Sequence, residues 1–526
     1  MRCHGAKALW VGGYLEVRLN RQSKNKTTLM PNYMNAITYY QERYRPQYHF
    51  SPERNWMNDP NGLVYAHGLY HLFYQHNPLG DQWGHMSWGH AVSRDLVHWQ
   101  HWPVALWETD EVMIFSGSAV LDVYNTSGLG TLDNPPLVAI YTGHYKTMEK
   151  QAQHLAYSLD RGRSWIPYAG NPVLDIGERD FRDPKVFWHA PEAQWIMVVA
   201  LAAARKIQIY ASKNLKEWTL RSTFGPAGAV EGVWECPDLF PLLVEGEPGS
   251  VRWVLKVDVN PGGPTGGSGS QYFIGYFDGS RFTPEEPVAV GQAHARWVDY
   301  GADFYAAITW FGAPGEDLYR LWVGWMNNWL YAHAIPTSPW RGQLSLARRV
   351  SLRRIGGRLH LVQAPVPSLS TLRQRYWAIE NQPIVGEQRL AIQGKTLELI
   401  AAFVVGKARV VGLKVRVGEG EETVIGYEVA TQRIFVDRKR SGLVAFHPKF
   451  ATRKEAKLPL EEGKLRLRVF VDWSSVEVFA GEGQVVFTEL IFPKPESEGV
   501  VMFAEGGEAH LVSLEAWELA SGWKAM

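Results

Sequence analysis

A recurring sequence pattern constrains the fold of this chain more than any other feature. A small or acidic residue opens a short apolar run at five points, at intervals of roughly 55 to 67 residues: Asp59, Ser116, Asp183, Asp238 and Asp303. A second pattern, in which Ser-x-Asp or Ser-x-Asn precedes a tryptophan, recurs between these points, at residues 93–99, 158–165 and 212–218. Recurrence at a nearly constant interval is the sequence signature of a repeat architecture.

The segments between the recurring points have the composition of β-strands. They are short runs rich in Val, Ile, Tyr and Trp, broken by Gly, Pro, Asp and Asn, as in GLVYA (62–66), LVAIYTG (137–143) and IQIYAS (207–212). Such runs are typical of strands. Five units of about four strands each predict a five-bladed β-propeller. The opening strands of the blades surround a central funnel, so we expect residues at the recurring points to meet there.

The pattern of residue types changes near residues 340–375. Beyond this segment, apolar and polar residues alternate, as in VIGYEVATQRIFVD (424–437) and LRLRVFVDWSSVEVFAG (465–481). A period of two residues indicates half-buried antiparallel strands. We therefore predict an all-β chain with a propeller over residues 41–362 and a C-terminal β-sandwich over residues 375–526.

Residues 1–40 are predicted to form an N-terminal arm that is disordered or not translated natively. Residues 8–15 are apolar, but Glu16 and Arg18 follow at once, and no small-residue cleavage site is recognisable. Native translation would then start at Met30 or Met34. Without a recognisable secretory signal, the sequence predicts a cytoplasmic protein.

Composition excludes several classes of partner. The net charge of +1 provides no basic field for nucleic acid or an anionic membrane. No run approaches the roughly 20 apolar residues that a membrane helix needs, and two cysteines cannot form a disulfide framework. The 23 Trp and 23 Tyr suit a sugar ligand, because these rings combine a flat apolar face with a polar tip. The oligomeric state is left open.

Three of the predicted blade openings carry acids in dense motifs. Asp59 lies in NWMNDPNG (55–62), where Asp-Pro and Asn-Gly favour a tight turn that fixes its direction. Asp183 lies in FRDP (181–184), where the neighbouring Arg182 favours the ionised carboxylate or clamps a ligand hydroxyl. Glu235 lies in WECPD (234–238), where bulky apolar neighbours are expected to favour the protonated acid.

Acids in this arrangement point to glycoside cleavage. That reaction needs one carboxylic acid to protonate the leaving oxygen and one carboxylate on the opposite face of the sugar. The 17 histidines are scattered, without a metal-ligand spacing, and the glycine cluster at 262–269 lacks the helix and lysine of a phosphate loop. We predict no metal and no cofactor. A non-catalytic sugar-binding propeller and an inverting five-bladed hydrolase remain alternatives.

The motifs NWMNDPNG, FRDP and WECPDLF, in this order, closely resemble the three signatures of glycoside hydrolase family 32, which contains invertases, levanases and inulinases. The resemblance runs from about residue 40 to the C-terminus and implies the same propeller and sandwich. It implies retention of configuration through a fructosyl-enzyme intermediate. Asp59 would be the nucleophile, Asp183 the transition-state stabiliser and Glu235 the acid/base.

The resemblance also implies substrate contacts and a substrate class. The contacts would be Asn58, Gln75, Trp83, Phe115, Ser116 and Arg182, with Asp303 and Trp329 at the rim or the floor of the pocket. The implied activity is exo-acting release of terminal non-reducing β-D-fructofuranosyl residues from fructans (levan, inulin), from sucrose, or from both. Ser87 stands where sucrose-6-phosphate hydrolases tend to carry a basic residue. That hydrolase and a fructosyltransferase on the same scaffold remain alternatives, and the linkage preference stays open.

Overall fold

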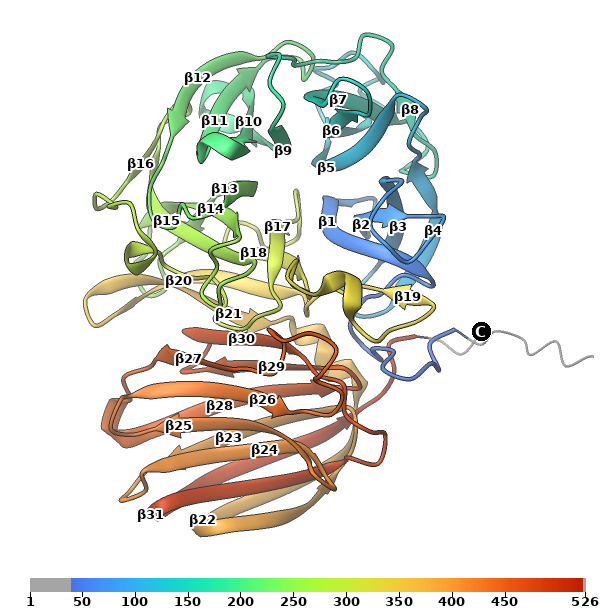
Figure 1. The fold of residues 1–526 in the computed structure, drawn as a ribbon. Coiled ribbons are helices and arrows are strands. Elements are labelled where there is room, and N and C mark those ends of the chain that lie inside the picture. The colour runs from blue at the N-terminus through green and yellow to red at the C-terminus, as the bar shows by residue number, and fades with distance from the viewer. Residues whose placement is uncertain (1–38, 524–526) are drawn as a thin grey trace, which may run out of the picture. The chain divides into compact units, whose positions relative to one another are not determined.

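The computed structural model describes residues 39–523, which fold into a five-bladed β-propeller followed by a β-sandwich (Figure 1). The prediction of an all-β fold with these two architectures is confirmed. The predicted arm, residues 1–40, and the proposed starts at Met30 and Met34 lie outside the described residues, apart from Tyr39 and Tyr40. Within residues 39–523, no helix is long and apolar enough to cross a membrane.

Each blade is an antiparallel sheet of four strands, and blade 1 has an additional short parallel strand at its inner edge. Blade 1 contains β1 (Asn55–Ala66), β2 (Leu69–Asn77), β3 (Ser87–Ser93), β4 (Trp99–Leu106) and the additional β19 (Trp340–Arg341). Blade 2 contains β5 (Val112–Leu121), β6 (Leu137–Tyr145), β7 (Lys150–Ser158) and β8 (Ile166–Pro167). Blade 3 contains β9 (Phe181–His189), β10 (Gln194–Leu201), β11 (Lys206–Ser212) and β12 (Thr219–Phe224). Blade 4 contains β13 (Val233–Leu243), β14 (Val251–Asn260), β15 (Gly269–Phe277) and β16 (Phe282–Pro284), and blade 5 contains β17 (Tyr305–Thr309), β18 (Arg320–Trp325), β20 (Arg348–Ile355) and β21 (Arg358–Pro365).

Ten strands build the sandwich, and short 3₁₀ helices occur in the connections. The strands are β22 (Arg373–Gln393), β23 (Leu397–Val404), β24 (Val410–Gly418), β25 (Glu421–Glu428), β26 (Arg433–Arg440), β27 (Arg453–Lys457), β28 (Lys464–Asp472), β29 (Ser475–Ala480), β30 (Val485–Leu490) and β31 (Gly499–Leu519). The 3₁₀ helices are η1 (Ala190–Glu192), η2 (Ala202–Ala204), η3 (Gln292–His294), η4 (Ala332–Ala334), η5 (Pro367–Leu372) and η6 (Glu461–Gly463). The predicted domain limits, 41–362 and 375–526, remain a proposal.

Strand β31 joins the two layers of the sandwich. Its first part, residues 499–505, pairs with β24, and its second part, residues 510–518, pairs with β23. Between the two parts lie Gly506 and Gly507, with φ angles of 69° and 155°. Glycine adopts positive φ at no steric cost, so this pair lets one strand leave one sheet and enter the other. Strand β22 pairs with both parts and follows the same bend.

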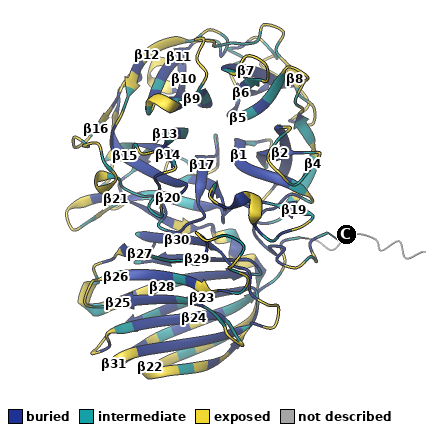
Figure 2. Ribbon diagram, viewed as in Figure 1, coloured by how far each residue is buried: buried dark blue, intermediate teal, exposed yellow. Residues whose placement is uncertain are grey.

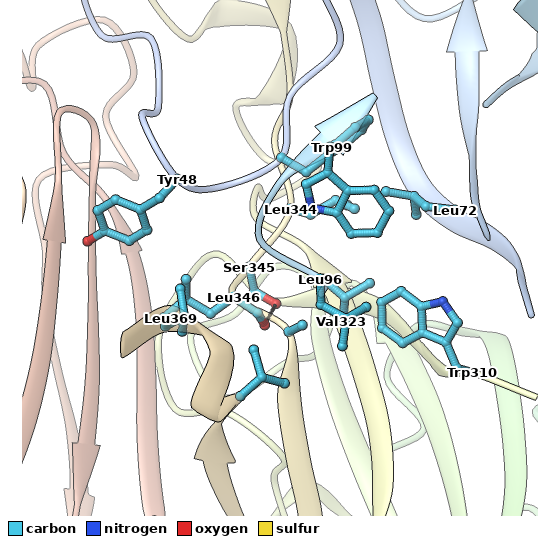
Figure 3. Close-up of a pocket in the computed structure, with 13 residues that line it drawn as sticks. Tyr48, Leu72, Leu96, Trp99, Trp310, Val323, Leu344, Ser345, Leu346 and Leu369 are labelled. Atoms are coloured by element: carbon cyan, nitrogen blue, oxygen red, sulfur yellow. Dashed lines mark hydrogen bonds between the residues drawn. The ribbon is translucent and has the colours of Figure 1, made fainter. Parts of the chain in front are cut away.

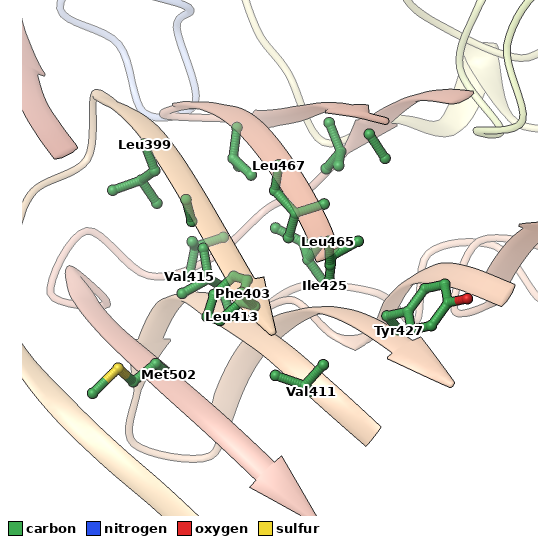
Figure 4. Packing of buried hydrophobic residues seen from close by; sticks show 14 of the residues in the cluster. Leu399, Phe403, Val411, Leu413, Val415, Ile425, Tyr427, Leu465, Leu467 and Met502 are labelled. Carbon is green, nitrogen blue, oxygen red and sulfur yellow. The ribbon is translucent and has the colours of Figure 1, made fainter. Parts of the chain in front are cut away.

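Apolar side chains fill the space between the sandwich layers and between neighbouring blades. In the sandwich, residues such as Phe403, Leu413 and Leu467 belong to one buried apolar cluster (Figure 4). In the propeller, separate clusters pack blade against blade; Ile196 and Leu239, for example, belong to the cluster between blades 3 and 4. Exposed residues are concentrated in turns and outer strands (Figure 2). This interblade packing fixes the inner strands around the funnel.

The innermost strand of every blade is interrupted by a β-bulge. The extra residues fall at Asn58 and Asp59, Phe115 and Ser116, Asp183 and Pro184, Cys236 and Pro237, and Ala306 and Ala307. A bulge breaks the strict alternation of side chains and redirects them. Proline is tolerated at such points because the bulge leaves its missing N–H without a ladder partner. Residues at corresponding levels of the five blades are thereby aimed into one region.

Buried ion pairs connect the propeller to the sandwich. Arg348 of β20 contacts Glu477 of β29 at 2.5 Å and Asp299 at 3.0 Å. His49 contacts Asp472 at 2.8 Å and the same Glu477 at 3.1 Å. Burial acts to lower the pKa of His49, but hydrogen bonds to the two carboxylates outweigh it and raise that pKa to about 9. His49 is therefore charged at neutral pH and balances part of the buried negative charge.

We expect Gly117→Ala to destabilise the protein by about 1–3 kcal/mol. A Cβ at this position of β5 would collide with the carbonyl oxygen of Ile140 on β6, a backbone atom that cannot move aside. Gly80→Ala is the matched control, because the nearest atom to its Cβ would be the Asn77 amide nitrogen at 3.6 Å. Thermal unfolding of both variants should show a lower midpoint for Gly117→Ala alone; equal midpoints would contradict the prediction.

Candidate functional site

The three predicted carboxylates lie in one cavity of about 350 Å³. Its walls come from strands of blades 1 to 4, from the loops that contain Trp83 and Asp180, and from the loop after β18 of blade 5, which contains Trp329. The lining residues are Asn58, Asp59, Gln75, Trp83, Phe115, Ser116, His144, Gln151, Asp180, Arg182, Asp183, Glu235 and Trp329. The structure therefore brings together every predicted site residue except Asp303.

Asp59 is buried, and two neighbouring side chains donate hydrogen bonds to it. Its Oδ1 accepts a hydrogen bond from Asn58 Nδ2 at 3.0 Å, and its Oδ2 accepts one from Ser116 Oγ at 2.7 Å. Asn58 is itself fixed by Trp56, whose indole N–H donates to Asn58 Oδ1 at 2.7 Å. Burial raises the pKa of Asp59 above its ordinary value, while the bonds from Ser116 and Asn58 act in the opposite direction. These donors orient the carboxylate and favour its ionised form.

Asp183 faces Asp59 across the thiol of Cys236. The Cys236 Sγ lies 3.6 Å from Oδ2 of each aspartate, and the Cys236 backbone N–H donates to Asp183 Oδ2 at 2.9 Å. Asp183 has a φ of 66°, a strained backbone conformation for this residue. Burial raises its pKa; the Arg182 charge opposes this rise, and the carboxylates of Glu235 and Asp59 add to it. Two acids placed this closely resist simultaneous ionisation.

Glu235 is held by polar partners from two other blades. Arg182 Nε of blade 3 donates to Glu235 Oε1 at 3.0 Å, and the Tyr305 hydroxyl of blade 5 donates to Oε2 at 2.5 Å. The expectation of a mainly apolar environment for this acid is not met. Burial and the nearby Glu235 raise the pKa of Tyr305, so its hydroxyl remains a donor. Both oxygens of Glu235 are therefore fixed in direction.

Aromatic rings form the rim of the cavity. Trp83 is 40% exposed, and its ring meets the edge of Phe115 at 6.0 Å. Phe115 stacks on His144 with ring centroids 4.6 Å apart. On the other side, Trp329 stacks on the buried Trp56 at 5.9 Å. Such faces suit the apolar face of a sugar ring.

Several lining residues were not found from the sequence. Arg182 Nη1 donates to Gln151 Oε1 at 3.3 Å and to Asp180 Oδ1 at 3.0 Å, so these two extend the polar wall beside Glu235. His144 and Gln151 lie at the ends of β6 and β7, outside any motif. Asp180 stands two residues before Arg182, so an acid adjoining the FRDP motif is the one signal that could have identified it.

Asp303 does not line the cavity, and the expectation that it forms the rim or floor is not met. It is fully buried, and its carboxylate bonds to Tyr331 and to Arg438 of the sandwich. The reason lies in the register of β17. The bulge of this strand falls at Ala306 and Ala307, beyond Asp303, so this acid is not redirected into the funnel.

Two other cavities lack this arrangement. One, of about 10 Å³, is enclosed by apolar residues of blades 1 and 5 such as Leu72, Trp310 and Leu344 (Figure 3). It is a packing void at the lower limit of what a water molecule needs. A larger one, of about 660 Å³, lies between blades 4 and 5; its acids, Glu285 and Glu286, are adjacent in sequence. The lining of neither contains acids from different blades.

The arrangement in the main cavity is suited to acid–base and nucleophilic chemistry on a sugar. A buried carboxylate beside hydrogen-bond donors can attack a carbon atom, and a second acid held by Arg182 and Tyr305 can deliver a proton. Among residues 39–523, no three His, Cys, Asp or Glu side chains gather as a metal-ligand set.

Two family models match nearly the whole chain, and both describe the family that the three motifs resemble. The family model described as glycosyl hydrolases family 32 N-terminal domain matches residues 49–365. The model described as glycosyl hydrolases family 32 C terminal matches residues 368–518.

Individual relatives are similar along most of their length. A levanase of Bacillus subtilis (strain 168) is 49% identical over 498 residues, which cover 92% of this chain and 72% of the levanase. An extracellular exo-inulinase of Aspergillus awamori is 43% identical over 525 residues, covering 93% of this chain and 97% of that protein. A crystal structure of the exo-inulinase from Aspergillus awamori has a TM-score of 0.87 at 41% identity, covering 92% of this chain and all of that chain.

The prediction of a cytoplasmic location is wrong. The exo-inulinases of Aspergillus awamori and Aspergillus ficuum, which are 43% and 42% identical to this chain, are named extracellular. These relatives point to secretion. The prediction relied on a missing leader pattern within residues 1–38, and these residues lie outside the described structure.

Asp183→Asn is expected to abolish activity and yet to stabilise the fold at neutral pH. Because the pKa of Asp183 is raised above 3.8, the folded protein binds this proton more strongly than the unfolded chain does. Wild-type stability is therefore lost as the pH rises from about 4 through the folded pKa. The variant has no carboxyl group at this position and does not lose this stability. The difference in melting temperature, variant minus wild type, should therefore be larger at pH 8 than at pH 4, by ~2 °C or more.

Asp95→Asn is the control with the opposite sign. Burial acts to raise the pKa of Asp95, but hydrogen bonds from the backbone and the side chain of His98 outweigh it and lower that pKa. Asp95 therefore contributes stability above pH 4, and its loss should destabilise the protein more at pH 8 than at pH 4. A pH-independent difference for Asp183→Asn would contradict the assignment of its raised pKa.

Proposed function

The chain belongs to glycoside hydrolase family 32, and from this we propose that it is a retaining, exo-acting β-fructofuranosidase. It hydrolyses terminal non-reducing β-D-fructofuranosyl residues of fructans such as levan and inulin, and of sucrose. One observation carries the proposal: Asp59, Asp183 and Glu235, from three different blades, line one cavity. The relatives named levanase and exo-inulinase support the substrate class.

In the first step, Asp59 attacks C2 of the terminal fructosyl unit. The bond from C2 to the leaving oxygen breaks, and Glu235 gives its proton to that oxygen. The donors Asn58 and Ser116 favour the ionised form of the attacking carboxylate and orient it. Asp183 accepts hydrogen bonds from the sugar hydroxyls as positive charge develops on the ring.

In the second step, water replaces the enzyme at C2. Glu235, now ionised, takes a proton from the water, which attacks C2 and releases Asp59. Arg182 and Tyr305 stabilise the ionised Glu235 of this stage, because both donate to its oxygens. The two displacements together retain the configuration at C2.

The polar side chains beside Arg182 are suited to bind the sugar that leaves. Glu235 must reach the oxygen that joins fructose to the rest of the substrate, and Arg182 lies directly against Glu235. Gln151 and Asp180 adjoin Arg182 on this side. Their amide and carboxylate groups are suited to hydroxyls of the departing sugar.

The lining residues also bear on the two alternatives. Among residues 39–523, Arg182 is the one Arg or Lys that lines the cavity, and it is already paired with Glu235 and Asp180. A phosphorylated sugar calls for additional cations, so sucrose-6-phosphate fits less well. A fructosyltransferase would use the same three carboxylates. It is separated from a hydrolase by measuring free fructose against oligosaccharide growth at high sucrose concentration.

Asp59→Ala is expected to abolish fructose release, because the variant has no nucleophile. The protein should still fold, because the change removes a single buried carboxyl group. Fructose release and thermal unfolding of the variant test this.

Glu235→Ala should reduce the rate on sucrose and inulin by about 10²–10⁴-fold, and less on substrates with good leaving groups, which need little protonation. Steady-state rates on both substrate types test this. An equal loss on both would remove Glu235 from the role of acid.

Hydrolysis of sucrose, inulin and levan side by side tests the proposed function. Fructose as the sole early product from both polymers is expected from exo action. A ladder of oligosaccharides would contradict it, and a product of inverted configuration at C2, seen by NMR within the first minutes, would contradict the double displacement.

A further inference from the structure

Asp303, which does not reach the cavity, forms the centre of a buried network between the propeller and the sandwich. Its Oδ1 accepts a hydrogen bond from the Tyr331 hydroxyl at 2.6 Å. Its Oδ2 accepts bonds from Arg438 Nη1 at 2.5 Å and from the backbone N–H of Leu490 at 2.7 Å. Arg438 and Leu490 lie on the sandwich strands β26 and β30.

Arg438 holds this network through every part of its guanidinium group. Besides Asp303, its Nη1 contacts Glu489 Oε2 at 2.8 Å, and its Nη2 donates to the Tyr331 hydroxyl at 2.7 Å. Its Nε donates to the carbonyl oxygen of Phe450 at 2.8 Å. The Tyr331 hydroxyl oxygen thus accepts from Arg438, and its O–H donates to Asp303, which fixes the direction of the hydroxyl.

The charges in the network make Arg438 hard to replace. Two buried carboxylates, Asp303 and Glu489, face this one guanidinium group. Burial raises the pKa of Glu489, and the adjacent Asp303 raises it further, while Arg438 lowers it. Removing the cation would leave two buried acids without the guanidinium group that pairs with them.

The network is connected to the cavity at two places, and the first is Trp329. Trp329 and Tyr331 share one loop, which is tied by Asn328: its Oδ1 accepts from the Leu330 N–H at 3.0 Å, and its Nδ2 donates to the carbonyl oxygen of Ala302 at 2.7 Å. The Tyr331 N–H also donates to the Asn328 carbonyl oxygen at 3.1 Å. Tyr331 is thus bonded through its hydroxyl to the interface network and through its backbone to the turn that carries Trp329.

The network reaches the cavity a second time through Tyr305. Asp303 stands two residues before Tyr305, at the entrance to β17. The Tyr305 hydroxyl donates to Glu235, the proposed acid/base, at 2.5 Å. A shift of Asp303 therefore moves the start of the strand from which Tyr305 holds Glu235.

We propose that Arg438, a residue of the sandwich, is a positioning residue for the reaction, acting through Tyr331 and Asp303 on Trp329 and Tyr305. The inference rests on the proposed function, because the reaction is the one that Glu235 and the cavity are proposed to carry out. The sandwich then contributes to catalysis without contributing a group that touches the substrate. Its contribution is to fix Trp329, which lines the cavity, and Tyr305, which holds Glu235.

Tyr331→Phe is the sharpest test, because it removes both hydrogen bonds of the hydroxyl and keeps the ring that packs edge-on against Phe450. Tyr427→Phe is the matched control: Tyr427 is a buried sandwich tyrosine whose hydroxyl donates to the Leu458 carbonyl oxygen at 3.0 Å, without contact to the propeller network. Arg438→Lys and Arg438→Met form a second pair. The lysine keeps the charge but loses the fork of donors.

For Tyr331→Phe we expect kcat/KM on inulin to fall about tenfold to a hundredfold, as displaced positioning groups cause. KM should rise through Trp329, and kcat should fall more on sucrose than on substrates with good leaving groups, through Tyr305 and Glu235. Tyr427→Phe should keep wild-type KM and kcat even if its melting temperature falls equally. Arg438→Lys should recover part of the loss seen in Arg438→Met. Equal kinetics in Tyr331→Phe and Tyr427→Phe would overturn the proposal.

A second readout does not depend on activity. In protein labelled with 5-fluorotryptophan, the ¹⁹F resonance of Trp329 is assigned by its disappearance in Trp329→Phe. This resonance should shift or broaden in Tyr331→Phe and stay unchanged in Tyr427→Phe; an unchanged resonance in both would overturn the proposal. If the wild-type protein releases no fructose while the resonance shifts as expected, the proposed function fails and the positioning of Trp329 stands.

Discussion

The bulge in the innermost strand of each blade is the constraint on which the site depends. A regular strand turns successive side chains to opposite faces, and in a propeller both faces are needed for packing between blades. The bulges at Asp59, Ser116 and Asp183 break this alternation at one level of the funnel. In blades 3 and 4 the bulge includes a residue with strained backbone, with φ angles of 66° at Asp183 and 46° at Cys236. Such strain costs about 1–3 kcal/mol per residue and persists because interblade packing holds it.

The site combines negative groups that oppose one another, and the fold supplies the donors that hold them. Asp59 and Asp183 share the thiol of Cys236, and Arg182 bridges from blade 3 to Glu235 of blade 4. The same principle recurs at the interface with the sandwich, where Arg438 faces two buried acids. A buried pair of this kind adds little to net stability but is costly to break. Its physical effect is to permit one geometry and to penalise others.

Most of the fold and the core of the site follow from the sequence, because both are recorded in local patterns. The interval between recurring acidic or small residues predicted the five blades, and three dense motifs predicted Asp59, Asp183 and Glu235 as cavity residues. The fifth recurring residue, Asp303, was misplaced, because its bulge lies farther along β17 and its partner Arg438 is far away in sequence. Tyr305 has no motif of its own. Its role follows from a contact between blades 4 and 5, which no local pattern records.

The bend at Gly506 and Gly507 has a consequence for the order of events during synthesis. Strand β31 is a neighbour of β22, β23 and β24, so both sheets of the sandwich lack a central member until it has been made. It is also translated after every other strand of the two domains. A nascent chain can therefore close its ring of blades on the ribosome and still lack the support behind Trp329. Competence for turnover would arise only once β31 has been made and paired.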